Sequence, residues 1–244
     1  MNGKNEKNSV KKYALLAAYS FPKRRITNNS ARFKYLFKNT RKVNMNSKIL
    51  KKYEIVSDLS TNAFSTLQNE IDKEIVMSIR GTDFTMPEDG DILTDALLLF
   101  GLEKSRNCYK NSYNNLKNII AKYKDYKITL VGTSLGARLC IDLLDSDLGK
   151  HINIVHAYNT ATSLTHLYRS ADCFLKRIPS KKIRLCENRT KLHIHMINND
   201  PISILSMGEK SKTRRVYDRK YKSSKLFQGK KNKIKTNHSI MNFV

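Results

Sequence analysis

Three features are scarce in this sequence: long apolar runs, cysteine and glycine. No apolar run reaches the roughly 20 residues that a transmembrane helix needs, so we expect a soluble or peripheral membrane protein. The four cysteines show no Cys-x-x-Cys spacing and indicate reduced thiols in an intracellular protein. Glycine occurs only nine times in 244 residues, so a motif that needs two glycines at fixed positions stands out.

An apolar segment near the N-terminus, Tyr13–Phe21, follows two lysines and has the composition of a signal sequence. The stretch Pro22–Arg25 comes directly after it and offers no cleavage site of small residues, so we expect a first helix in place of a signal peptide. We expect residues 1–12 to be disordered and residues 13–52 to be helical in pieces.

Acidic residues are scarce at both ends of the chain. Residues 1–52 hold fifteen Lys and Arg against one acid, residues 210–244 hold twelve against one, and residues 53–209 hold nineteen of each sign. This pattern predicts one globular domain over residues 53–244, preceded by a basic N-terminal segment. The formal net charge of +25 fits attraction to a polyanion, either an anionic membrane surface or nucleic acid. A general excess of Lys and Asn, as A-rich codon usage produces, explains it equally well.

The most informative stretch is Lys127–Cys140. It begins as an apolar run typical of a buried parallel strand and continues into the motif Gly-Thr-Ser-Leu-Gly at residues 132–136. The following residues predict an amphipathic helix that ends near Gly149 as its C-cap. Its two faces are apolar (Leu135, Leu139, Leu143 and Leu144) and polar (Arg138, Asp142 and Asp145), and Cys140 is expected to pack as a small hydrophobic residue.

A strand, a tight turn and a helix form the context in which a Gly-x-Ser-x-Gly motif has chemical meaning. The turn holds Ser134 in a strained conformation that exposes its hydroxyl. Gly132 and Gly136 lack a Cβ, so the strand and the helix can pass close together. The helix N-terminus directs free N–H groups at the space above the serine. We therefore predict Ser134 as a nucleophile.

Three strands are expected before this motif, at Glu54–Val56, Ala63–Gln68 and Lys73–Ile79, the last two as an antiparallel hairpin. The third strand runs into Arg80-Gly81-Thr82-Asp83. A polar, glycine-bearing loop that follows a strand ahead of the nucleophile is where an oxyanion hole is built in such folds. Thr82 could donate a backbone N–H and its hydroxyl there, and an ordinary turn capped by Thr82 is the alternative.

Two apolar segments follow this loop. Residues 83–102 are either a buried helix, which we favour slightly, or a mobile flap over an acyl pocket. Apolar and tyrosine side chains then recur at helical spacing over residues 109–123, which predicts an amphipathic helix packed on a sheet.

Two further strands are expected, at residues 152–157 and 191–197. His193 and His195 share one face of the second strand, but no third ligand has suitable spacing, so we expect a solvated or packed face and no metal site. The strand ends in Asn199-Asp200-Pro201, and an acid at the carboxyl end of a parallel strand lies at the functional edge of the sheet. One histidine, His238, follows this acid.

The chain resembles the fungal-type (class 3) lipases of the α/β-hydrolase superfamily. The resemblance spans roughly residues 73–240 and rests on Arg80-Gly81-Thr82, the Ser134 motif, Asn199-Asp200-Pro201 and the late His238. It implies Ser134 as nucleophile, Asp200 as triad acid and His238 as base, with Thr82 and the amide of Leu135 in the oxyanion hole. The family usually carries His before the serine and a further Gly after the motif, where this chain has Thr133 and Ala137.

We therefore predict an α/β-hydrolase fold with a mainly parallel central sheet flanked by helices. The expected activity is hydrolysis of carboxylic esters of acyl lipids, triacylglycerol or phospholipid, through a Ser-Asp-His triad and an acyl-enzyme, with no metal or organic cofactor. The alternatives are a catalytically silent module whose basic flanks hold nucleic acid or a membrane, and an acyltransferase with the same triad. The segment Lys210–Lys235 lies between the proposed acid and base, so we expect it to loop out and to bring its charges near an anionic membrane. Nucleic acid is the less favoured partner.

Overall fold

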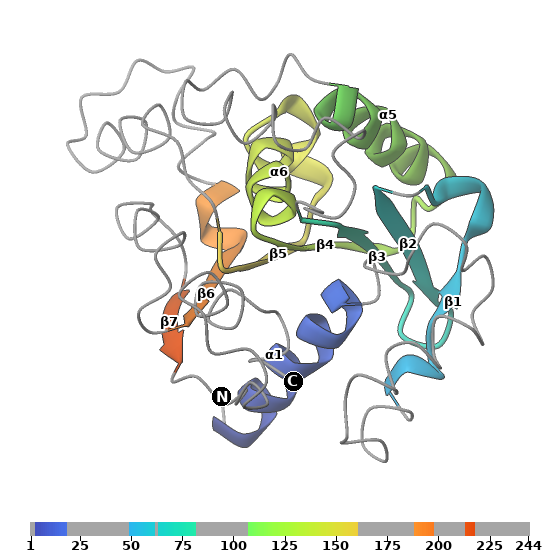
Figure 1. Cartoon of the computed structure of the whole chain (residues 1–244). Coiled ribbons are helices and arrows are strands. Elements are labelled where there is room, and N and C mark those ends of the chain that lie inside the picture. Colours follow the sequence, from blue (N-terminus) through green and yellow to red (C-terminus); the bar gives the residue numbers. More distant parts are fainter. Residues whose placement is uncertain are drawn as a thin grey trace, which may run out of the picture.

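A computed structural model of the chain describes residues 3–18, 49–61, 63–81, 107–160, 188–197 and 213–217. In this part of the chain, a seven-stranded sheet lies between helices on both of its faces (Figure 1). The strands are β1 Glu54–Ile55, β2 Phe64–Asn69, β3 Glu74–Ile79, β4 Lys127–Thr133, β5 Ile154–Tyr158, β6 Leu192–Ile197 and β7 Thr213–Tyr217. The helices are α1 Gly3–Ala18, α5 Asn107–Lys122 and α6 Leu135–Leu144, with short 3₁₀ turns η1 Ser57–Leu59, η4 Asp147–His151 and η5 Arg189–Lys191.

The strands are arranged in space in the same order as in the chain, from β1 to β7. β1, β2 and β3 pair antiparallel, which confirms the predicted hairpin, and β3 to β7 pair parallel. The segment expected to loop out between residues 210 and 235 is therefore not a single loop, because Thr213–Tyr217 pairs along β6 as a strand. Since β3 to β7 are parallel, their carboxyl ends meet at one edge of the sheet.

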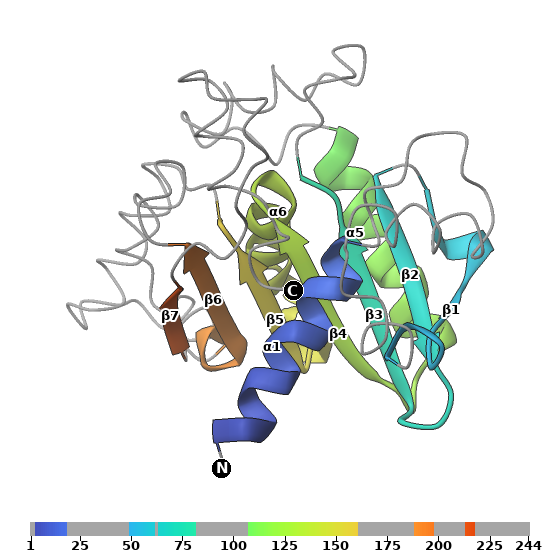
Figure 2. The same ribbon diagram turned by 60° about the horizontal axis from the view of Figure 1, so that its bottom comes forward.

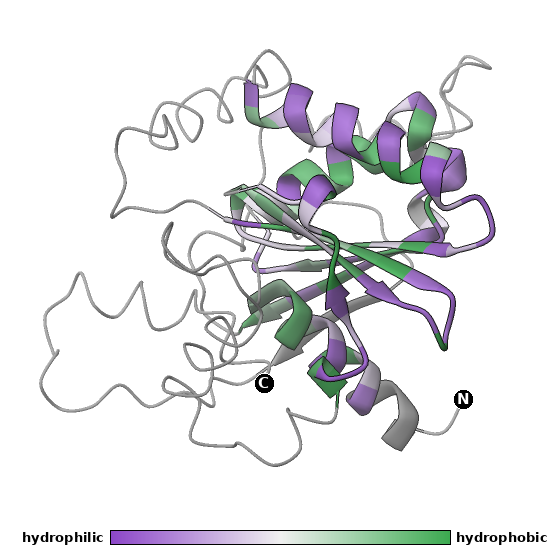
Figure 3. Cartoon of the chain, turned by 90° about the vertical axis from the view of Figure 1, so that its right-hand side faces the viewer, coloured by the Kyte–Doolittle hydropathy of each residue, from purple (hydrophilic) through white to green (hydrophobic). Residues whose placement is uncertain are grey.

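One face of the sheet packs against α5 and α6. Strand side chains alternate between the two faces, so Ile75, Met77 and Ile79 of β3 all enter this core. The predicted helix over residues 109–123 is confirmed as α5, which buries Leu116 and Ile119. Its outward surface is hydrophilic, as Figure 3 shows, and the elements on this face enclose the larger hydrophobic core.

Helix α6 differs from its prediction in two respects. Arg138 and Asp142, expected on a polar face, are 0% exposed, and their Nη2 and Oδ1 atoms lie 3.5 Å apart, one helical turn along. Opposite charges at this spacing face each other on a helix and can be buried together at lower cost than either alone. The helix ends at Leu144 with Asp145 as its C-cap, whereas Gly149 lies in η4. Cys140 packs in the core as expected.

The opposite face of the sheet is covered by α1, which lies across it in front of β4 and β5 in Figure 2. The expectation that residues 1–12 are disordered was wrong for residues 3–12, because the helix begins at Gly3. Its buried side chains join a second apolar cluster with Leu67, Val76 and Val131 of the sheet. No helix among the described residues is long and apolar enough to cross a membrane.

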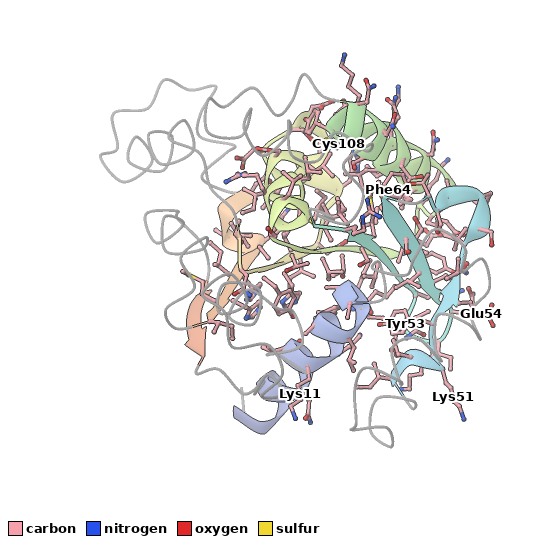
Figure 4. The ribbon with its side chains drawn as sticks, in the orientation of Figure 1. Lys11, Lys51, Tyr53, Glu54, Phe64 and Cys108 are labelled. Atoms are coloured by element: carbon pink, nitrogen blue, oxygen red, sulfur yellow. The ribbon has the colours of Figure 1, made fainter. Side chains whose placement is uncertain are left out.

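Polar contacts also attach α1 to the sheet. The Lys12 ammonium donates to Glu74 Oε2 at 2.8 Å, and the Tyr13 hydroxyl donates to Oε1 at 2.7 Å. Tyr53, labelled in Figure 4, donates to the same carboxylate. Burial opposes ionisation of Glu74, but the hydrogen bonds from Lys12 and Tyr53 offset it and hold the pKa of Glu74 below its ordinary value. The Ser78 hydroxyl donates to the Leu16 carbonyl at 2.8 Å, near the C-terminal end of the helix.

Candidate active site

Ser134 occupies the sharp turn between β4 and α6. Its φ of 55° and ψ of −124° place it in a backbone region that side-chain-bearing residues rarely adopt. It is the N-cap residue of α6, yet its side chain makes no capping hydrogen bond. A serine at the N-cap ordinarily accepts a hydrogen bond from the helix backbone. Ser134 does not, so helix capping does not explain why a serine stands here.

Glycines make this turn possible, because each lies against backbone atoms with no room for a side chain. A Cβ on Gly132 would lie 2.5 Å from the carbonyl carbon of Gly136, so β4 and α6 could not approach as they do. A Cβ on Gly81 would lie 2.6 Å from the Thr133 carbonyl oxygen and 3.2 Å from the Ser134 Cβ. The loop after β3 therefore starts directly beside the proposed nucleophile.

Leu135 is the first residue of α6, so its N–H has no acceptor within its own helix. This is the backbone donor that the sequence predicts for the oxyanion hole, and it follows Ser134 directly. Thr82, the other predicted donor, comes one residue after Gly81 and lies outside the described residues. Of the two predicted donors, the described residues thus include Leu135, together with Gly81, the residue before Thr82.

Asp200 and His238 also lie outside the described residues, as do residues 83–102. The described part of β6 ends at Ile197, three residues before the proposed acid. β4, β5 and β6 are adjacent and parallel, so Ser134 and Ile197 lie at strand ends on the same edge of the sheet. The positions of Asp200 and His238, and with them the triad, stay a prediction.

Sequence reasoning missed a polar residue at this edge, Asn159, which follows β5. It has a φ of 44°, its N–H donates to the His195 carbonyl at 2.8 Å, and its Oδ1 accepts from the Ile197 N–H at 3.0 Å. The preceding Tyr158 carbonyl accepts from the Ser134 N–H at 3.0 Å. An asparagine just after a buried strand was the available signal, since Asn tolerates a positive φ better than most residues.

The two histidines of β6 lie on the α1 side of the sheet beside His156 of β5. His156 Nδ1 and His195 Nε2 lie 3.0 Å apart, and Tyr13 of α1 stacks on the His156 ring at 4.2 Å between centroids. Burial lowers the pKa of both partners, to about 3 for His195. Among the described residues, no group of three or more His, Cys, Asp or Glu side chains is placed to hold a metal ion.

No protein-family model matches the sequence, and no curated protein matches it. Solved structures do. A triacylglycerol lipase whose catalytic centre is a serine protease triad superposes with a TM-score of 0.55 at 11% identity, over 100% of this chain and 94% of its own. A mutant form of MDLA from Penicillium cyclopium superposes with a TM-score of 0.54 at 16% identity, over 92% of this chain and 85% of its own. Lipase II from Rhizopus niveus superposes with a TM-score of 0.51 at 14% identity, over 84% of this chain and 77% of its own.

Identity this low shows a shared fold. The chain has an α/β-hydrolase fold. Two of these three solved neighbours are described as lipases, in agreement with the family that the sequence resembles. In this fold, Ser134 lies at the turn between the fourth strand of the sheet and the helix that follows it, at the carboxyl edge of the parallel strands.

Proposed function

We propose that this α/β-hydrolase is a serine hydrolase of the lipase and esterase type. The observation that carries the proposal is the backbone of Ser134, with its φ of 55° and a hydroxyl that caps nothing. Such a conformation costs on the order of 1–3 kcal/mol and persists where the surrounding structure holds it. Three glycines packed against backbone hold it here, at positions 81, 132 and 136.

In the proposed reaction, the Ser134 hydroxyl attacks the ester carbonyl while His238 accepts its proton. The Leu135 amide and the Thr82 donors stabilise the oxygen of the tetrahedral intermediate. The intermediate collapses to an acyl-enzyme as His238 protonates the departing alcohol, and water then repeats the sequence to release the acid and free Ser134. Asp200 orients the imidazole and stabilises its protonated form.

We propose acyl lipids, triacylglycerol or phospholipid, as the substrate class. Support comes from the fold, since solved neighbours that share it are lipases. We also propose peripheral contact with an anionic membrane through the basic flanks. Residues 1–52 hold fifteen Lys and Arg and residues 210–244 hold twelve, so these flanks carry 27 of the 46 bases and only two acids.

A fluorophosphonate probe tests the proposal directly, because it labels a serine only where a base activates it. Wild-type protein should be labelled at Ser134, and Ser134→Ala should abolish labelling. Ser146→Ala is the matched control, since Ser146 is a capping serine whose oxygen accepts from the Leu148 N–H at 3.2 Å. Absence of label on the wild type would favour a catalytically silent module that binds a polyanion.

The triad and the acceptor need separate measurements. Ser134→Ala, Asp200→Ala and His238→Ala should each remove most activity on a panel of acyl esters. Any two together should cost little more than the worse single change, because the three residues act as a unit. Near-normal turnover by His238→Ala would reject that histidine as the base. Analysis of products with added alcohols distinguishes hydrolysis from acyl transfer.

A further inference from the structure

We propose that Asn159 is a positioning residue for the catalytic acid: it fixes the end of β6, from which the acid loop departs, to the strand that supports the nucleophile. The inference rests on the proposed function, because it assumes the roles given above to Ser134 and Asp200. Its evidence is a chain of hydrogen bonds across the carboxyl edge of the sheet.

The first link is a single peptide unit. The peptide between Tyr158 and Asn159 accepts from the Ser134 N–H through its carbonyl at 3.0 Å and donates through its N–H to the His195 carbonyl at 2.8 Å. A peptide unit is planar and stiff, so its two hydrogen bonds are fixed relative to one another. The backbone of the nucleophile is thereby tied to β6 through one rigid group.

The second link is the Asn159 side chain. The regular pairing of β5 with β6 ends at Tyr158 and His195. The φ of 44° at Asn159 turns the chain out of the strand, and its Oδ1 accepts from the Ile197 N–H at 3.0 Å. The side chain thus continues the pairing by one further bond, up to the last described residue of β6. Asp200 follows three residues later.

The other end of the same side chain carries a donor. Asn159 is 0% exposed, and its Nδ2 has no hydrogen-bond partner among the described residues. A buried amide N–H without an acceptor costs about 1–3 kcal/mol, and a carboxylate is the acceptor that compensates it best. We infer that Nδ2 is available to a carboxylate at this edge of the sheet, and the Asn159→Asp variant below tests that role.

Substitutions at Asn159 separate these roles. Asn159→Gly retains the left-handed backbone but loses the side-chain bond to Ile197 and the Nδ2 donor. We expect kcat on a soluble ester to fall about 10- to 100-fold with little change in KM, as for a small misplacement of a catalytic group. A mispositioned acid stabilises the imidazolium less, so the pKa of the base falls and the acid limb of kcat/KM should move to lower pH.

Asn159→Asp retains an oxygen for the Ile197 N–H but replaces the donor with a second carboxylate. That charge favours the protonated histidine, so the acid limb should move to higher pH, opposite to the glycine variant. Opposite shifts cannot arise from loss of stability alone. Melting temperatures of both variants would be measured beside the pH profiles.

The chain offers a matched control at the other end of β5. The Asn153 N–H donates to the Ile128 carbonyl at 2.9 Å, and its Oδ1 accepts from the Ile128 N–H at 2.8 Å. Asn153 thus uses the same two groups, its backbone N–H and its Oδ1, at the end of β5 opposite to the catalytic edge. Asn153→Gly should lower the melting temperature and leave the pH profile unchanged. If the probe labels wild type but the Asn159 variants also keep the wild-type profile, the positioning role is rejected and the proposed function stands. If wild type is not labelled, the proposed function itself fails.

Discussion

Gly136, in the first turn of α6, lies directly against the carbonyl oxygen of Arg80 at the end of β3, where a Cβ would approach that oxygen to 2.6 Å. The helix that follows the nucleophile and the strand that leads to the predicted oxyanion loop are therefore in backbone contact. Any side chain at position 136 must displace one of them.

Gly136→Ala should consequently impair both stability and catalysis. Inserting a methyl group where only backbone can yield costs about 1–3 kcal/mol, and the end of β3 with Gly81 would move away from Ser134. We expect kcat on a soluble ester to fall on the order of 100-fold, since shifts of about 1 Å have that effect. Ala121→Gly, at an exposed site on α5, provides a control, because it weakens a helix by about 1 kcal/mol without altering turnover. Normal kinetics in Gly136→Ala would mean that the contact has no influence on the site.

The oxyanion hole gives a second prediction. If the Thr82 hydroxyl also donates to the tetrahedral oxygen, Thr82→Val should lower kcat by about 10²–10³, the usual effect of one lost donor. KM should hardly change, since the interaction strengthens only as charge develops on the oxygen. Steady-state kinetics on a soluble ester decide the question, and a change confined to KM would mean that residue 82 only shapes the pocket.

The elements nearest the nucleophile could be predicted from the sequence because their signals are local. Lys127–Thr133 shows strand composition, and the glycines at 132 and 136 specify the turn between strand and helix. Helix α5 likewise carries its own apolar stripe. Each of these patterns is complete within a few residues.

The missed features depend on partners distant in sequence. Lys12 is half-buried on the sheet-facing side of α1, where Glu74, 62 residues away, accepts its hydrogen bond. The contact of Asn159 with β6 exists only in the folded chain, since its Oδ1 accepts from the N–H of Ile197, 38 residues further along. Arg138 and Asp142 were assigned to a polar face on their charge, although their spacing of four residues could have indicated a buried pair.

The buried histidines predict a loss of stability in mild acid. His156 and His195 are neutral in the folded protein because burial lowers the pKa of both, to about 3 for His195, below the ordinary value of 6.5. The neighbouring histidines, and Lys12 in the case of His156, act in the same direction. In the unfolded chain both protonate near pH 6.5, so their contribution is complete above that pH and declines as pH falls toward the folded pKa. Each group costs up to about 1.4 kcal/mol per pH unit in this window.

Urea unfolding between pH 4 and 8 measures this slope. Replacing both residues, as in His156→Gln with His195→Gln, should flatten it whatever the absolute stability of the variant. His151→Asn serves as the control, because it replaces an exposed histidine in η4. A slope that survives the double replacement would assign the acid sensitivity to other groups.

The basic C-terminal region predicts that activity on anionic interfaces depends on salt. Arg214 and Arg215 lie in β7 at the edge of the sheet, and Lys230 and Lys231 follow in the same basic segment. Basic residues near an anionic lipid surface contribute about 1 kcal/mol each at low salt, and the attraction fades beyond a Debye length of roughly 8 Å at physiological ionic strength. Activity on anionic vesicles should therefore fall as salt rises, while turnover of a soluble short-chain ester should not.

Neutralising these four residues with glutamine should flatten the salt dependence on vesicles and leave soluble-ester turnover intact. The matched control is glutamine at four exposed lysines outside this segment, two just before β1 (Lys51 and Lys52) and two around the start of β4 (Lys124 and Lys127). This control variant changes the net charge by the same amount. If it keeps the wild-type salt dependence on vesicles, that dependence arises from where the charges lie and not from the total charge. An equal salt response on both substrates in the wild type would reject interfacial attraction and leave codon usage or nucleic acid as the explanation of the charge.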